Sequence, residues 1–163
     1  MLLNFIELLA FILPMYVANA SPVLIGGGAP LDFGKRFLDG RPILGPHKTF
    51  RGLIGGLAVG WAASTIISAL FGWRWLTLGL PASVGSLIGD LAGAFIKRRI
   101  GLKAGASAPL LDQLDFVVGA LLLVYPIYEL TTTTVLLSLI LTPPIHLTTN
   151  WIAFKLNLKE VPW

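Results

Sequence analysis

Long apolar runs separated by shorter polar segments dominate this sequence. Each run approaches or exceeds the roughly 20 helical residues that cross the hydrocarbon core of a bilayer. They are Leu2 to Ala20, Gly52 to Gly72, Leu76 to Ile96, Leu114 to Leu130 and Thr132 to Phe154, the last interrupted by Pro143-Pro144. The pattern predicts an all-α integral membrane protein with about five transmembrane helices.

A signal peptide is the alternative interpretation of the first run, because Ala18-Asn19-Ala20 resembles a cleavage site. No Lys or Arg precedes this run, however, and Asn4 and Glu7 stand where a positive flank is expected. We therefore expect the first run to be a retained span.

The polar segment from Gly26 to Arg51 is rich in Gly and Pro, which makes regular structure there improbable. Apolar residues such as Phe33, Phe37 and Phe50 interrupt it and argue against disorder. Ordered loops of this length are usually functional. We expect this loop to pack on the membrane face or to fold over a site.

Glycines recur every four residues in two of the predicted spans, at Gly52, Gly56 and Gly60 and again at Gly85, Gly89 and Gly93. Stripes of small residues let helices approach closely in a membrane. Both spans should therefore pack tightly, with each other as one candidate pairing.

The composition supports a membrane protein. Of 163 residues, 55% are hydrophobic and only 12% are charged, whereas soluble domains carry about 25% charged residues. The length suggests one domain, residues 1–163. The absence of cysteine excludes disulfides and thiolate metal sites. With only His47 and His146 far apart in sequence, a zinc enzyme is not expected.

The basic residues gather in alternate connecting segments and near the C-terminus, leaving Arg74 alone between the second and third spans. By the positive-inside rule, the N-terminus lies outside, and both long loops and the C-terminus face the cytoplasm. Such loops attract lipid headgroups or small anionic substrates, and we expect no nucleic-acid partner. The sequence does not predict an oligomeric state.

Asp90 lies within the third predicted span, where an ionised carboxylate is costly unless it is paired or binds a metal. One interpretation is a metal ligand, since acids inside spans are usually functional. The other is a structural ion pair with Lys97, although seven residues is a long reach along a helix.

Asp112 and Asp115 are three residues apart at the start of a predicted helix and therefore share a face. Helix capping explains one acid well and two less well. Together with Asp90 they form a set of oxygen donors suited to a hard cation such as Mg²⁺.

Lys97, Arg98, Arg99 and Lys103 lie between these acids. Each alone is explained as a topology signal. As a cluster beside a divalent cation, they resemble the clamp that holds a triphosphate. No GxxxxGK[ST] loop occurs, which excludes a P-loop NTPase.

The spacing resembles the signature of the integral-membrane CDP-diacylglycerol synthases. Lys97-Arg98, four residues, Lys103 and then Asp112-Gln113-Leu114-Asp115 follow that pattern, and Gly89-Asp90 matches the acid before it. The chain departs from it in lacking the serine and the His-Gly-Gly of the loop, and in having Gln113 where an arginine stands. The shorter archaeal branch, the CDP-archaeol synthases, is similar almost end to end, including the loop from Pro30 to Leu53.

This resemblance implies a membrane-embedded, Mg²⁺-dependent cytidylyltransferase of phospholipid biosynthesis in the cell membrane, with its active site facing the cytoplasm. It would transfer CMP from CTP to an isoprenoid ether-lipid phosphate, 2,3-bis-O-geranylgeranyl-sn-glycerol 1-phosphate, and release CDP-archaeol and pyrophosphate. The metal ligands would be Asp90, Asp112 and Asp115, with Lys97 also catalytic. Substrate contacts would come from Lys97, Arg98, Lys103, Lys48, Thr49, Arg51, Gly52 and Asp39.

Two rival hypotheses are a CDP-alcohol phosphotransferase and a small transporter or channel with Asp90 as an ion site. The first needs a longer acidic signature than Asp39-Gly40-Arg41 begins. A transporter or channel needs polar residues along several spans, and the second and fourth predicted spans contain almost none.

Overall fold

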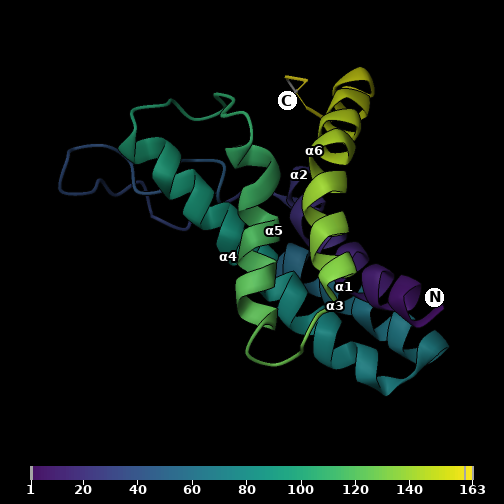
Figure 1. Cartoon of the computed structure of the whole chain (residues 1–163). Coiled ribbons are helices and arrows are strands. Elements are labelled where there is room, and N and C mark those ends of the chain that lie inside the picture. Colours follow the sequence, from purple (N-terminus) through teal and green to yellow (C-terminus); the bar gives the residue numbers. More distant parts are fainter. Residues whose placement is uncertain (1, 160, 163) are drawn as a thin grey trace.

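Six α-helices and a short 3₁₀ helix form the part of the chain that the structure describes, residues 2–159 and 161–162, in this computed structural model (Figure 1). They are α1 (Leu2–Ala20), α2 (Pro22–Ile25), α3 (Phe50–Phe71), η1 (Trp73–Trp75), α4 (Leu76–Arg99), α5 (Leu111–Val124) and α6 (Thr132–Lys155). The predicted all-α class is confirmed for these residues.

Among the described residues, four segments are long and apolar enough to cross a membrane: Leu2–Ile25, Phe50–Phe71, Trp73–Arg99 and Thr132–Lys155. The predicted span Leu114 to Leu130 is instead the 14-residue helix α5, followed by turn residues. At about 1.5 Å per residue α5 is roughly 21 Å long, shorter than a hydrocarbon core of about 30 Å. The count of five spans therefore stays a prediction.

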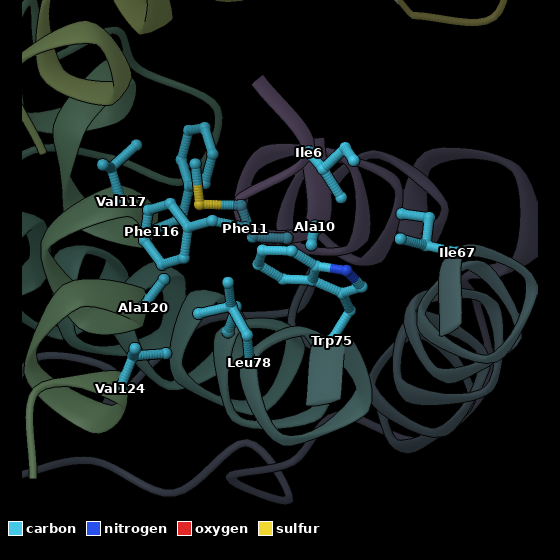
Figure 2. Packing of buried hydrophobic residues seen from close by; sticks show 12 residues of the cluster. Ile6, Ala10, Phe11, Ile67, Trp75, Leu78, Phe116, Val117, Ala120 and Val124 are labelled. Carbon is cyan, nitrogen blue, oxygen red and sulfur yellow. The ribbon is translucent and has the colours of Figure 1, made fainter. Parts of the chain in front are cut away.

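The core lies where α1, α4 and α5 meet, beside η1 and α3. Figure 2 shows Trp75 between Phe11, Leu78 and Ile67, with Phe116 of α5 close by. Phe11 is fully buried at the middle of α1. The first apolar run is thus part of the packed fold, as expected of a retained span.

The glycine stripes let the helices touch through their backbones. A Cβ added at Gly60 of α3 would lie 2.6 Å from the Ser83 hydroxyl of α4, so these two helices do pack together. The α4 stripe faces elsewhere: a Cβ at Gly89 would lie 2.2 Å from the backbone oxygen of Asp115 in α5. Close packing is confirmed, and α5 is the main partner of α4.

Helix α6 is continuous through Pro143 and Pro144, and the predicted interruption was wrong. Membrane helices tolerate proline where other groups satisfy the backbone. The hydroxyls of Thr142 and Thr148 bond within the helix on either side of the two prolines, to the Ser138 oxygen and, at 2.7 Å, to the Pro144 oxygen. Thr131 caps the start of α6, accepting from the Thr134 N–H at 3.3 Å.

The predicted irregular loop is confirmed over residues 26–49, where the backbone forms only turns and two isolated bridges, Pro30 with Thr49 and Arg36 with Pro42. Its outer part is fixed to the carboxyl end of α4. Arg99 pairs with Asp39 at 2.7 Å and lies over the ring of Phe37 at 4.7 Å. The loop therefore lies beside the cationic end of α4, as Figure 1 shows.

Candidate active site

A cavity of about 960 Å³ brings together segments that are far apart in the sequence: the α1–α2 corner, the long loop, the carboxyl half of α4, the start of α5, and α6 with the tail after it. The predicted site residues that line this cavity are Lys48, Thr49, Gly52, Asp90, Lys97, Arg98, Asp112 and Asp115.

Asp90 is paired with a lysine of the long loop. The Nζ of Lys48 lies 2.7 Å and 2.6 Å from the two carboxylate oxygens of Asp90. Both side chains keep 27% of their surface exposed, so they remain reachable from the cavity. The pairing with Lys97 considered from the sequence is not the one that forms.

Lys97 pairs instead with Asp112. Its Nζ donates to one carboxylate oxygen at 2.7 Å and to the backbone oxygen of Ala106 at 3.1 Å. The other oxygen of Asp112 accepts from the Ala108 N–H at 2.8 Å. Asp112 thus binds the loop that precedes α5 as well as a lysine of α4.

Asp115 lies one turn further along α5 and faces α4. A Cβ at Gly93 would stand 1.9 Å from its carboxylate oxygen, so only glycine leaves room for this side chain. Gly93 follows Asp90 by three residues and shares its helix face. The carboxylate of Asp115 therefore lies beside Asp90, and this proximity of two acids was expected from the sequence.

Arg98 contributes a buried guanidinium to the cavity wall, with 4% of its surface exposed. It donates to the Lys103 backbone oxygen at 3.1 Å, while its Nε is buried without a hydrogen-bond partner among the described residues.

Thr49 accepts from the Gly52 N–H at 3.1 Å and caps α3. The amino end of α3 therefore borders the cavity.

Three predicted site residues lie outside the cavity lining: Asp39, Arg51 and Lys103. Asp39 pairs with Arg99 at the outer part of the loop, and Arg51 and Lys103 are exposed. The structure therefore separates these three from the eight that line the cavity.

Comparison with known proteins identifies the family. The CarS-like CDP-archaeol synthase family model matches residues 1–163. A CDP-archaeol synthase of Pyrococcus furiosus is 46% identical over 163 residues, covering 97% of this chain and 98% of the relative. One of Sulfolobus acidocaldarius is 43% identical over 156 residues, covering 95% of this chain and 96% of the relative.

The chain belongs to the CDP-archaeol synthase family. A solved structure described as an intramembrane enzyme for archaeal membrane lipids biosynthesis also matches, with a TM-score of 0.81 and 39% identity. That match covers 87% of this chain and 91% of the solved one. The expectations of an integral membrane protein and of an enzyme of the cytidylyltransferase class are confirmed at this level, and the family favours neither rival hypothesis.

Whether a metal ion fits the cavity of this member of the CDP-archaeol synthase family depends on which oxygen donors line it. Among the described residues, no three acidic or histidine side chains stand close enough to form a preformed metal site. Mg²⁺ usually takes only one or two carboxylates, and substrate phosphates and water complete its shell. Asp90 and Asp115, adjacent on the cavity wall, satisfy that requirement chemically.

Asp32 organises the loop that carries Lys48, and the sequence analysis missed it. One carboxylate oxygen accepts from the Gly34 N–H, and the other from the N–H groups of Leu44 and Gly45, each at 2.9 Å. Burial alone would raise the pKa of Asp32, but these backbone hydrogen bonds together bring it below its ordinary value. The signal was Asp followed by Phe-Gly, an Asx-turn pattern.

Replacing Asp32 by Asn should loosen residues 33–47, because the amide offers one acceptor oxygen where the carboxylate offers two. Each lost bond to a charged group costs about 1.5–3 kcal/mol. Since the folded pKa lies below the unfolded one, the stabilisation is present above about pH 4 and disappears as the pH falls through the folded value. Hydrogen exchange should be faster in these peptides of the variant at neutral pH and unchanged in α3. Equal exchange in variant and wild type would contradict the role.

Four polar side chains of α6 and the tail also line the cavity and were not predicted as site residues: His146, Thr149, Asn150 and Lys159. The sequence analysis considered His146 only as a zinc ligand, and Lys159 only as one of the basic residues near the C-terminus. Tertiary packing brings the α6 residues to the site: the His146 ring lies 6.0 Å from that of Phe116 in α5, and Thr142 of α6 bonds to Tyr16 of α1 at 2.7 Å.

Proposed function

We propose that this enzyme transfers CMP from CTP to 2,3-bis-O-geranylgeranyl-sn-glycerol 1-phosphate, giving CDP-archaeol and pyrophosphate, with Mg²⁺ as cofactor. The supporting observation is the cavity in which carboxylates and cations from α4, α5 and the long loop meet. Membership in the CDP-archaeol synthase family adds the reaction class.

The reaction is a displacement at phosphorus. An oxygen of the lipid phosphate attacks the α-phosphorus of CTP, a new P–O bond forms, and the bond to the β-phosphate oxygen breaks with pyrophosphate leaving. The attacking oxygen is already ionised at neutral pH, so no general base is needed. The protein must align the two phosphates and neutralise their charge.

Lys48, Lys97 and Arg98 supply that charge in the proposal. Lys48 and Lys97 contact carboxylates at 2.6 Å and 2.7 Å and would exchange these partners for phosphate oxygens of CTP. The buried Nε of Arg98 offers a further donor. Thr49 and Gly52 place the amino end of α3, which favours anions, at the cavity edge.

Asp90 and Asp115 are the proposed pair of Mg²⁺ ligands, and Asp112, which pairs with Lys97 at 2.7 Å, stays the third ligand predicted from the sequence. When bound, the ion would offset phosphate charge and help to orient the triphosphate. The carboxylates themselves hold Lys48 and Lys97 in the cavity. The sequence also predicts substrate contacts from Asp39, Arg51 and Lys103, and these contacts remain predictions.

The isoprenoid chains would lie on the side of the cavity next to α1, α2 and α6. Val23, Leu24, Ile145, Ala153 and Leu158 line it there. These apolar side chains need no polar partners in a bilayer, so they suit hydrocarbon chains.

The topology is also proposed: five spans, N-terminus outside, and the cavity facing the cytoplasm. It follows that a cysteine replacing Lys35, which is exposed in the long loop, should be protected from an impermeant thiol reagent in intact cells. The same reagent should label it after permeabilisation. Labelling in intact cells would invert the orientation.

The reaction is tested by incubating purified protein with radiolabelled CTP, Mg²⁺ and either the ether-lipid phosphate or an ester analogue. We expect a labelled CDP-lipid and one pyrophosphate per product from the ether lipid, and no product with EDTA. Release of pyrophosphate without a labelled lipid would contradict the proposed transfer.

A further inference from the structure

The outer part of the long loop forms a small hairpin, residues 35–43. The Phe37 N–H donates to the Arg41 backbone oxygen at 2.8 Å, and the Gly40 N–H donates to the Phe37 oxygen at 2.9 Å. Leu38 stands inside this turn, at the tip of the hairpin, and its side chain is 95% exposed. The hairpin therefore presents a large apolar side chain outward from a backbone that is held by hydrogen bonds.

The hairpin is fixed to the last turn of α4, beside which the loop runs in Figure 1. The Arg41 guanidinium donates to the backbone oxygens of Arg98 and Arg99, at 3.4 Å for Arg98. Arg99 in turn lies over the rings of Phe37 and Phe95, at 4.7 Å and 4.8 Å. Since α4 is long and apolar enough to cross a membrane and ends at Arg99, these contacts hold the hairpin at the level where the bilayer core gives way to headgroups.

Phe33, just before the hairpin, lies beside the end of a second span. Its ring is 5.3 Å from that of Phe50, the first residue of α3. Phe33 has a positive φ of 51° and is 68% exposed. The left-handed conformation is costly for a bulky residue, and contact of its ring with water adds a second cost. Lipid around the ring removes that second cost.

The exposed charges around these apolar side chains are mainly basic. Lys35, Arg36 and Arg41 are exposed, whereas the one acid in residues 35–43, Asp39, pairs with Arg99 at 2.7 Å. An apolar tip flanked by basic residues is the pattern with which protein segments bind an anionic membrane surface. Two such hairpins would repel each other, so the charge favours lipid over a second copy of the chain.

We propose that this hairpin binds the anionic surface of the bilayer. Leu38 and Phe33 insert at the boundary between headgroups and acyl chains, and the basic side chains face the headgroup phosphates. Residues 33–43, all of which the structure describes, lie outside the cavity lining, so this contact is separate from the proposed lipid-substrate site. It holds the long loop, which carries Lys48, against the membrane, and it does not depend on the proposed reaction.

The test exploits the absence of cysteine from the chain. Purified Lys35→Cys protein, labelled with a small fluorophore, is reconstituted into vesicles of phosphatidylcholine and phosphatidylglycerol that carry nitroxide lipids. We expect a nitroxide near the headgroup to quench the label at least about twofold more than one at the end of the acyl chain. Equal quenching in vesicles without phosphatidylglycerol would overturn the role of the basic side chains.

The variant Leu38→Ser, made in the labelled Lys35→Cys protein, tests the insertion itself. It should lower the quenching by the headgroup nitroxide at least about twofold, because the inserted apolar side chain is lost. The matched control is Leu156→Ser, since Leu156 is also an exposed leucine but lies after α6 and outside the cavity lining. This control should leave the quenching unchanged, and Leu38→Ser should keep its CTP turnover in detergent.

Two other results would overturn the inference. Strong quenching by iodide in the water, with none by the nitroxide lipids, would mean that the hairpin stands in water. Protection of the label from both kinds of quencher would mean that another protein chain covers the hairpin. Neither result bears on the transfer of CMP, which is tested separately by formation of the radiolabelled lipid.

Discussion

Asn in place of Asp90, Asp112 or Asp115 should lower Mg²⁺-dependent CTP turnover by roughly 10²–10³-fold, the usual effect of removing one group that stabilises developing charge. Each variant keeps the size of the side chain and removes its negative charge. The largest loss is expected at Asp90 and Asp115, which line the cavity from the facing helices α4 and α5. Initial rates with saturating CTP and lipid phosphate measure the effect.

The alternative role for Asp90 is purely structural: it would hold the Lys48 side chain in place through the contact at 2.6 Å. The double variant Asp90→Asn/Lys48→Met separates the two roles. If Asp90 served only as the partner of Lys48, removing both would cost little more than removing Lys48 alone. If Asp90 also binds the metal, the double variant is far less active than Lys48→Met alone.

Glu129→Gln is the matched control for these variants, because Glu129 is an exposed acid between α5 and α6 and does not line the cavity. It should retain wild-type turnover. Thermal unfolding in detergent checks that each Asn variant remains folded. Near-wild-type turnover in all three Asn variants would remove the metal assignment.

Replacing Lys48 by Met should lower kcat/KM for CTP by about 10²-fold, because the proposed charge-assisted contact to phosphate is lost and Asp90 is left without its cation. The KM for the lipid phosphate should change much less. Rates measured over a range of CTP concentrations at fixed lipid give both values.

Lys35→Met is the control for this prediction. Lys35 belongs to the same loop, is exposed and does not line the cavity, so the change removes one positive charge from the loop without touching the site. A similar loss of activity in both variants would mean that the loop acts only through its general charge, contrary to the role of Lys48 in binding the triphosphate.

The hydrophobic pattern predicted most of the fold because membrane helices carry their signal locally. The runs over α1, α3, α4 and α6 were each found within a few residues of their observed bounds. The end of helix α5 was harder to predict, because Pro126 and the turn around it lie in a stretch that is still mostly apolar. Composition predicts that a segment avoids water and does not fix where its helix ends.

The acidic residues of the site could be predicted for a related reason, because carboxylates are rare within apolar spans and are usually functional there. Their partners could not be found in the same way. Asp90 pairs with Lys48, 42 residues away, and not with Lys97 on its own helix. Such a pairing depends on how the long loop folds back, and Asp32 governs that fold through backbone hydrogen bonds that leave only a short turn signature in the sequence.

Residues of α6 escaped prediction because a long, mostly apolar helix with isolated polar residues resembles any membrane span. The role of His146 and Asn150 becomes apparent only because they line the same cavity as Asp112 and Asp115. Proximity of this kind comes from tertiary packing, here the contact of α6 with Phe116.

Binding of CTP to the purified wild-type protein, titrated with and without Mg²⁺ and in the absence of lipid, tests most directly whether these carboxylates and lysines form one nucleotide site. We predict saturable binding that requires the metal, is lost in Asp90→Asn and Lys48→Met, and persists in Glu129→Gln. Equal CTP affinity in EDTA, or unchanged affinity in both site variants, would contradict it.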